Sequence, residues 1–164
     1  MSKKDTLKIK EACLLLLSLA DKWQDGKPLD HEEIDLLAWA IAENLQVRDY
    51  AMSALLMDKF ESVTLTIDFY DELVSLVSDE YKHSILSILA ILWYGAEDDE
   101  LSARNLSMAL ALKPDYKLAL LVQRIHSANW PHEVVQNMFN ELHPTVRASV
   151  TEGGEYAEML VSQG

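Results

Sequence analysis

Five histidines are the residues of this 164-residue chain best suited to acid–base chemistry or metal binding. They are His31, His83, His126, His132 and His143. No two of them form a His-Glu-x-x-His pair, the spacing that lets one helix face hold zinc. His126 and His132 stand on either side of an expected helix break, so nothing in the sequence fixes two imidazoles on one site. We therefore predict no metal site.

The potential nucleophiles also lack the surroundings that catalysis needs. The chain has no Gly-x-Ser-x-Gly turn and no glycine-rich phosphate loop. Cys13 is the single cysteine, which excludes an internal disulfide and a cysteine zinc cluster. It lies in the apolar run EACLLLLSLAD with no identifiable base beside it, so we expect a small buried side chain. We predict no catalytic residue, no cofactor and no enzyme activity; a small enzyme of unrecognised type is the open alternative.

Carboxylates dominate the charged residues. The net charge is −13, and eighteen acidic residues against four basic ones fall within residues 23–100. Neighbouring acids such as Glu32 and Glu33 point apart on a helix, which favours a solvated face over an acid–base pair. The acids at 97–100 fit the start of a helix better than a calcium loop, whose spaced ligands are missing. The charge repels phosphates, so we expect neither nucleic acid nor a membrane as a direct partner.

Helical spacing of apolar residues and the scarcity of Gly and Pro predict an all-α fold. We expect a helical bundle or a short right-handed α-α superhelix of seven to nine helices. It forms a single domain over residues 1–150, followed by a flexible tail at 151–164. The expected helices cover residues 6–23, 30–45, 47–60, 67–77, 80–94, 98–112, 116–128 and 131–142, and Pro144 starts one more short turn.

Local signals place the ends of these helices. Gly26 is expected in a left-handed turn after the first helix, and Asp30 is expected to cap the second. Thr66 is the expected cap of the fourth helix, Gly95 ends the fifth, and Asn129 caps the eighth. The segment SILSILAILWYG has no polar face, so we expect the fifth helix at the centre of the protein.

One hairpin has a repeat-like pattern. Its residues are Leu86, Leu89, Ala90 and Trp93 in the first helix, Ser102, Leu106 and Ala109 in the second, and Pro114 after it. This pattern resembles a tetratricopeptide-type unit, with Ala90 in place of the usual Gly and Ser102 in place of Ala. It predicts close packing of the two helices, and it predicts that Leu86, Leu89, Trp93, Leu106, Ala109 and Leu120 are buried together. An ordinary helical bundle with one such hairpin is the alternative.

A longer resemblance covers residues 50–135. It rests on VRDYAMSALLMD, on an apolar helix containing Trp, on the turn at 95–98, on an Ala-rich helix, and on Pro-Asp-Tyr at 114–116 before a Leu-rich helix. These features resemble the helical C-terminal part of an uncharacterised actinobacterial domain family of unknown function, whose members carry further sequence before it. The resemblance implies helical structure and an actinobacterial or actinobacteriophage origin, and it implies no activity.

Two classes of function follow. The first is a non-enzymatic interaction or adaptor module that binds a protein or peptide through a groove between helices, with Trp130 and His126 as candidate contacts. The alternative is an acidic regulator or inhibitor, DNA mimics included, that binds a basic surface of its partner. For this class the candidate contacts are Glu32, Asp35 and Asp49.

The N-terminal segment MSKKDTLKIKEACLLLLSLADK bears on location. It has the outline of a secretory signal, with basic residues, a short apolar run and small residues at its end. Asp5 and Glu11 interrupt the basic region, and the apolar run is too short to span a membrane. We expect an amphipathic first helix and a cytoplasmic protein. The sequence leaves open the partner's identity and whether copies of the chain form a homo-oligomer.

Overall fold

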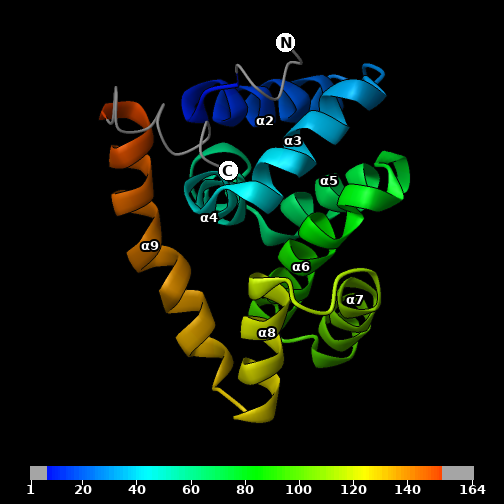
Figure 1. Ribbon diagram of the computed structural model, residues 1–164. Coiled ribbons are helices and arrows are strands. Elements are labelled where there is room, and N and C mark those ends of the chain that lie inside the picture. The colour runs from blue at the N-terminus through cyan, green and yellow to red at the C-terminus, as the bar shows by residue number, and fades with distance from the viewer. Residues whose placement is uncertain (1–6, 153–164) are drawn as a thin grey trace.

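The computed structural model describes residues 7–152, and its regular elements are all helices (Figure 1). In chain order these are α2 (Ile9–Gln24), α3 (His31–Glu43), α4 (Leu45–Ala54), the short π-helix η1 (Leu55–Lys59), α5 (Val63–Leu76), α6 (Asp79–Gly95), α7 (Asp99–Leu112), α8 (Lys117–Ser127) and α9 (His132–Glu152). The predicted all-α class is confirmed. None of the helices in this part of the chain is both long and apolar enough to cross a membrane.

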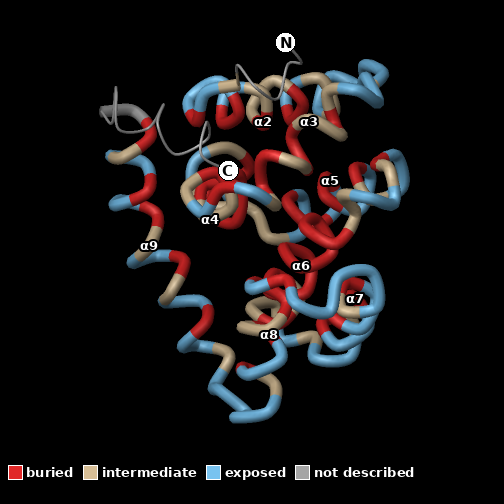
Figure 2. Tube along the Cα trace, in the orientation of Figure 1, coloured by how far each residue is buried: buried red, intermediate tan, exposed pale blue. Residues whose placement is uncertain are grey.

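Helix α6 is the central element. It contacts α3, α5, α7, α8 and α9, and every residue from His83 to Leu92 is buried (Figure 2). A helix that is apolar on all sides is stable in water only when other elements enclose it. The central position predicted from its sequence is therefore confirmed.

Helices α6 and α7 pack closely through small residues. Ala90, Ser102 and Ala109 have no exposed surface, and Ser102 Oγ donates a hydrogen bond to the Ala90 carbonyl at 2.6 Å. Such a bond between a side chain and the backbone of the other helix requires a close approach of the two helix axes. The close packing predicted for this hairpin is confirmed.

The predicted buried cluster is confirmed only in part. Its members Leu86, Leu89, Leu106 and Ala109 are buried, whereas Trp93 and Leu120 are partly exposed. Trp93 still packs against the core. The prediction that Leu120 is buried was wrong. The inward face of α8 is formed by other residues, among them Leu118, Val122 and Ile125, and Leu120 lies at the edge of that face.

Helices α2, α6 and α8 end in the same turn. Gly26, Glu97 and Asn129 have left-handed backbones, with φ of 72°, 66° and 50°. In each turn, the N–H of this residue and the N–H of the next one bond to carbonyls in the preceding helix, as in a Schellman motif. The prediction for Gly26 is confirmed. Gly95 is the last residue of α6, but Glu97 takes the left-handed position, and Asn129 ends α8 instead of capping the next helix.

The start of α5 differs from the prediction. Ser62 Oγ accepts a hydrogen bond from the Leu65 N–H at 3.2 Å, so Ser62 is the cap and the helix begins at Val63. Thr66, the predicted cap, instead donates to the Ser62 carbonyl at 2.7 Å. The expected helix began at residue 67 because the β-branched residues before it disfavour helix, but helix propensity is a weak preference that a cap and tertiary packing override.

Helix α9 is longer than predicted. It continues through Pro144 to Glu152, so Pro144 lies inside a helix and not at the start of a new turn. Proline there removes one helical hydrogen bond, which the packing of α9 on the rest of the protein compensates. The predicted tail at 151–164 lies outside the described residues except for 151 and 152, which belong to α9.

Two glycines give a test of these helix ends. A Cβ on Gly26 would meet nothing within 4 Å, so Gly26→Ala adds only backbone strain at a φ of 72°. We expect it to lower the free energy of unfolding by about 1 kcal/mol. Gly95→Ala lies in a helix and places its Cβ 3.4 Å from Phe139 Cε2, an ordinary contact. We expect this change to be neutral or to stabilise by up to about 1 kcal/mol.

Urea unfolding followed by circular dichroism measures both variants against the parent protein. A greater loss of stability for Gly95→Ala than for Gly26→Ala would contradict the geometry of both helix ends.

Candidate functional site

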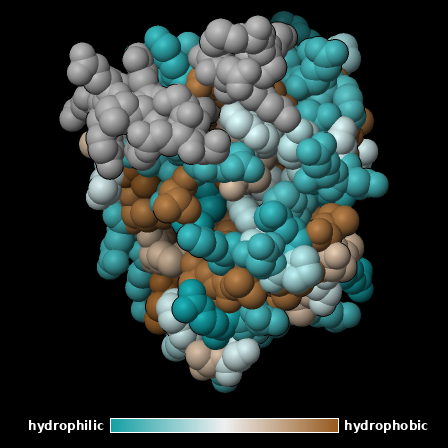
Figure 3. All heavy atoms as spheres, in the orientation of Figure 1, coloured by the Kyte–Doolittle hydropathy of each residue, from teal (hydrophilic) through white to brown (hydrophobic). Residues whose placement is uncertain are grey.

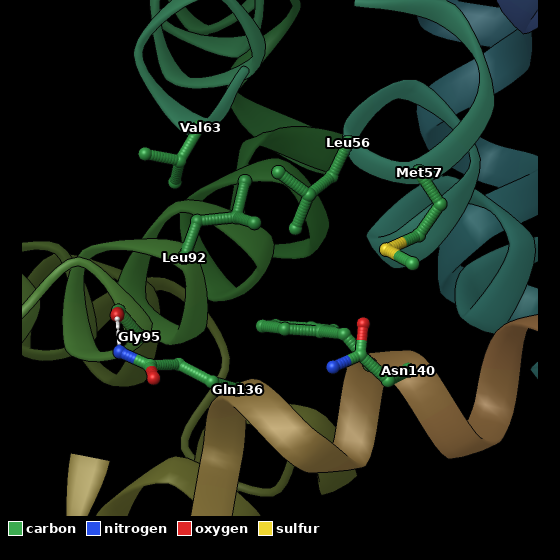
Figure 4. Close-up of a pocket in the computed structure, with 8 residues that line it drawn as sticks. Leu56, Met57, Val63, Leu92, Gly95, Gln136 and Asn140 are labelled. Carbon is green, nitrogen blue, oxygen red and sulfur yellow. Dashed lines mark hydrogen bonds between the residues drawn. The ribbon is translucent and has the colours of Figure 1, made fainter. Parts of the chain in front are cut away.

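An apolar cavity of about 320 Å³ lies between helix α9 and the body of the protein (Figure 4). It is lined by Leu56, Met57, Val63, Leu92, Gly95, Gln136, Phe139 and Asn140. In Figure 4 the side chains of Leu56, Val63 and Leu92 point into one end of the space, and Met57 and Asn140 lie at the other. Its volume lies in the range of pockets that hold small molecules or a large apolar side chain.

The π-helix forms one wall of this cavity. Helix α4 widens into η1 at Leu55, and the next two side chains, Leu56 and Met57, both line the cavity. A π-turn changes the direction in which successive side chains project, and such turns are frequent at functional sites. The chain then turns at Glu61, whose φ is 51°, and Ser62 starts α5, which places Val63 on the same wall.

Helix α9 forms the opposite wall. Phe139 is buried, while Gln136 and Asn140 lie beside it at the surface. Gln136 Nε2 donates a hydrogen bond to the Gly95 carbonyl at 2.8 Å, which ties α9 to the last residue of α6. The side-chain amide of Asn140 makes no hydrogen bond to the described residues, so it can bond to a bound molecule.

A polar cluster next to this cavity, with Ser53 and His143 buried and Asp58 at the surface, fastens α9 to α4 and η1. His143 Nδ1 lies 2.9 Å from Ser53 Oγ, and His143 Nε2 lies 2.7 Å from Asp58 Oδ2. A second bond, from Gln46 Nε2 to Ser149 Oγ at 3.0 Å, joins the same two helices further along. These bonds give α9 a fixed register on α4, because buried polar groups accept few alternative partners.

The Ser53–His143–Asp58 cluster has the residue types of a catalytic triad, but its surroundings do not suit catalysis. Ser53 is 0% exposed and its hydroxyl also bonds to the Asp49 carbonyl at 3.0 Å. A substrate therefore has no path to this oxygen, so we assign the cluster a structural role. The sequence could not reveal it, because Ser53 and His143 are 90 residues apart and no local motif connects them.

The single cysteine of the chain is also buried. Cys13 is 2% exposed, and burial raises its pKa to about 12. It is therefore a neutral thiol at neutral pH, which agrees with the buried apolar role expected from the sequence.

The structure places the predicted partner contacts of the groove at the turn between α8 and α9. Trp130 is 36% exposed, and its carbonyl accepts a hydrogen bond from the Tyr94 hydroxyl. His126 is partly buried and its Nε2 lies 2.9 Å from Ser102 Oγ. Since that hydroxyl donates its proton to a carbonyl of α6, His126 Nε2 is the donor. Neither Trp130 nor His126 lines the α9 cavity.

The three predicted acidic contacts lie on α3 and α4. Glu32 is exposed. Asp35 is partly buried and its Oδ1 accepts a hydrogen bond from the Ser78 N–H at 2.8 Å, at the start of α6. Asp49 is partly buried and pairs with Arg48 at 2.9 Å. The structure therefore does not bring the acids together with Trp130, because the turn between α8 and α9 lies far from α3 and α4 (Figure 1).

The histidines connect helices in this fold. His31 Nδ1 bonds to the Leu76 carbonyl at 2.7 Å, and His132 Nε2 lies 2.6 Å from Asp99 Oδ1. Within the part of the chain that the structure describes, no three His, Cys, Asp or Glu side chains gather in a way that could hold a metal ion.

The structural role of the polar cluster can be tested with His143→Leu. This change removes both bonds of the ring while keeping an apolar side chain between α9 and α4. We expect a loss of about 1–3 kcal/mol of unfolding free energy, the usual effect of losing buried hydrogen bonds. His31→Leu is the control, because the His31 side chain is 60% exposed and should lose less.

Reactivity gives an independent measurement. We expect a fluorophosphonate probe to leave Ser53 unmodified in the folded protein, as judged by mass spectrometry. Labelling of Ser53 under native conditions would show that the cluster is reachable and would overturn the structural assignment.

Comparison with known proteins extends the resemblance found in the sequence. A family model described as a domain of unknown function, DUF4192, matches residues 3–132. The match begins well before residue 50, where the expected resemblance began, and it ends where α9 starts. No curated protein and no solved structure matches the chain, so the tetratricopeptide resemblance stays a prediction. Because the matched residues make up most of the chain, the protein belongs to the DUF4192 family of unknown function.

Proposed function

We propose that this protein is a non-enzymatic interaction module that binds an apolar side chain of a protein or peptide in the α9 cavity. The observation that carries the proposal is the cavity itself, an apolar hollow of about 320 Å³ with an unbonded amide, that of Asn140, at its edge. Apolar pockets of this kind receive the anchoring side chains that supply most of the energy of protein recognition.

The chemistry of the lining supports binding over catalysis. Its side chains are aliphatic, aromatic or amide, and none of them is an acid, a base or a nucleophile at neutral pH. The Asn140 amide can pair with the backbone of an incoming peptide, as side chains at the rim of peptide grooves do. The remaining features inferred from sequence, a cytoplasmic location and an actinobacterial or phage source, belong to the same proposal.

The surface around α9 also supports a docking face. Figure 3 shows apolar surface beside α9 and over α8 on a face that is otherwise largely hydrophilic. Val134 and Trp130, near the start of α9, are 44% and 36% exposed. Large exposed apolar side chains that cluster near a cavity are typical of interaction sites.

The acidic-regulator alternative has less support. Of its three candidate contacts, Asp35 and Asp49 already serve as partners of Ser78 and Arg48. Of the three candidates, Glu32 remains exposed, so a basic partner would meet fewer available carboxylates than the sequence suggests. The cavity is therefore the preferred docking site.

A large side chain introduced at the edge of the cavity tests the proposal. Peptides selected on the folded protein from a random phage-displayed library provide the ligands. We expect Asn140→Trp, which places an indole at the cavity edge, to weaken these peptides at least about tenfold. Asn137→Trp is the matched control, since Asn137 is exposed on α9 and does not line the cavity. Fluorescence anisotropy gives the affinities.

Salt dependence separates the two classes of function. Binding in an apolar cavity should change little between about 50 mM and about 500 mM salt, because screening acts on charges. A steep loss of affinity with salt, together with an unaffected Asn140→Trp variant, would favour the acidic surface and reject the cavity.

A further inference from the structure

A second hollow lies at the other end of α6, away from the α9 cavity. It consists of two adjoining cavities of about 340 and 290 Å³, which share Ala42, Glu43 and Lys113. Its walls come from α3 and the start of α4, from the first turns of α6, and from the turn between α7 and α8. We call this hollow the trough.

Two buried aromatic residues of the trough carry polar atoms without a hydrogen-bond partner among the described residues. They are His83 Nε2 and the Tyr116 hydroxyl, on residues that are 5% and 7% exposed. The two rings meet edge to face, with centroids 4.8 Å apart and planes at 80°. Buried polar atoms are nearly always satisfied in native proteins, so two such atoms in one hollow point to an external partner.

His83 offers a hydrogen-bond acceptor. Burial first, and then the charge of Lys113, lower the pKa of His83. The backbone of Glu80 acts on the ring and raises the pKa of His83, but less than burial lowers it. The ring is therefore neutral at neutral pH, and in the tautomer that carries its proton on Nδ1 it presents a lone pair at Nε2 to an N–H or O–H donor.

Tyr116 offers a donor. Burial is the main cause that raises the pKa of its phenol, so the hydroxyl keeps its proton. The charges that act on this phenol are those of Arg48, Asp49 and Glu43, and two of these residues line the trough. The phenol therefore lies near the charged residues at the α3–α4 end of the trough.

Charges of opposite sign face the trough from different elements. Glu43, at the end of α3, makes no ion pair with the described residues, and neither does Lys117 at the start of α8. Lys113 has only a long contact of 3.8 Å to Asp115, whose side chain is 84% exposed. The trough thus combines an acceptor side, Glu43 and His83, with a donor side formed by the two lysines and Tyr116.

We propose that the trough binds a carboxylate that has an N–H on the neighbouring carbon, as found in a free amino acid or in the last residue of a peptide. The carboxylate bonds to Lys113, Lys117 and the Tyr116 hydroxyl. The N–H bonds to His83 Nε2 or to the Glu43 carboxylate. A ligand of this class satisfies both groups of polar atoms at once, whereas a simple anion would leave the acceptors unpaired.

A set of matched probes tests this chemistry on the full chain by amide-resolved NMR titration. N-acetyl-L-leucine carries both groups, N-acetyl-L-leucinamide lacks the carboxylate, and 4-methylpentanoate lacks the N–H. We expect saturable shifts for residues 42–43 and 113–117 with N-acetyl-L-leucine. Each incomplete probe should bind at least about tenfold more weakly, because it leaves one side of the trough unpaired.

L-leucine distinguishes the two sources of this chemistry. Tighter binding of L-leucine than of its N-acetyl form indicates a free amino acid, and the reverse order indicates the end of a peptide. The proposal is overturned if neither compound gives saturable shifts, or if 4-methylpentanoate binds as well as they do.

Tyr116→Phe gives the residue-level test, because it removes one oxygen and keeps the ring. We expect it to weaken N-acetyl-L-leucine about three- to tenfold, the effect of losing one hydrogen bond. Tyr50→Phe is the control, a buried tyrosine on α4 that does not line the trough. Equal affinities for both variants and the parent protein would remove Tyr116 from the site and contradict the proposal.

Discussion

The need to enclose α6 determines the architecture of this protein. This helix has buried side chains on all sides from His83 to Leu92, and no single partner can cover it. Burying one aliphatic side chain stabilises a fold by about 1.5–3 kcal/mol, so a helix of this kind favours a compact arrangement of several helices around it. Helices α3, α5, α7, α8 and α9 each cover part of its surface.

The α9 cavity and the trough lie where this cover becomes incomplete, at the two ends of α6. The α9 cavity reaches Leu92 and Gly95 at the C-terminal end, and the trough reaches Glu80 and His83 at the N-terminal end. Neighbouring helices diverge as they leave a central one, because helices pack at an angle to each other. Two separate binding sites can therefore arise from a single buried helix.

Helix α9 differs from the other helices that cover α6. It follows α8 after a short turn, yet it packs mainly on α4, far back in the chain. The family match ends at residue 132, so the wall that α9 contributes to its cavity lies outside the matched residues. Residues of the trough lie inside the match. The α9 wall can therefore change without altering the matched domain.

The sequence was sufficient where local signals decide the structure. Apolar periodicity predicted the helices and the central position of α6, and Asp30 and Gly26 marked two helix ends correctly. The prediction was wrong where two local signals compete, or where tertiary packing outweighs a local signal. Ser62 and Thr66 are both possible caps, and only the packing of α5 selects Ser62. Pro144 usually ends a helix, but the contacts of α9 with α4 outweigh the lost hydrogen bond.

The candidate sites were beyond the reach of sequence reasoning for a related reason. The walls of the α9 cavity come from segments around residues 56, 92 and 139, and the trough joins residues 43, 83 and 116. Amphipathic periodicity tells which side of a helix is buried, but it does not tell which buried sides meet. Trp130 was a candidate partner contact and is 36% exposed, yet it does not line the cavity.

The strong negative charge has a local explanation in this structure. Asp30 and Asp98 cap α3 and α7, and Asp35 bonds to the backbone at the start of α6. Acids at these positions also interact favourably with the positive ends of the helix dipoles. These three acids therefore stabilise helix ends and do not require a basic partner.

Against this acidic background, the positions of the basic residues carry more information. Arg48, Lys113 and Lys117 come from α4, from the turn after α7 and from α8, and they meet at the trough. Three acidic residues, Glu43, Glu80 and Asp115, also line the trough, so its wall is balanced in charge while the chain as a whole carries −13. This balance makes the trough less repulsive to a small anionic group than the rest of a protein with so negative a net charge.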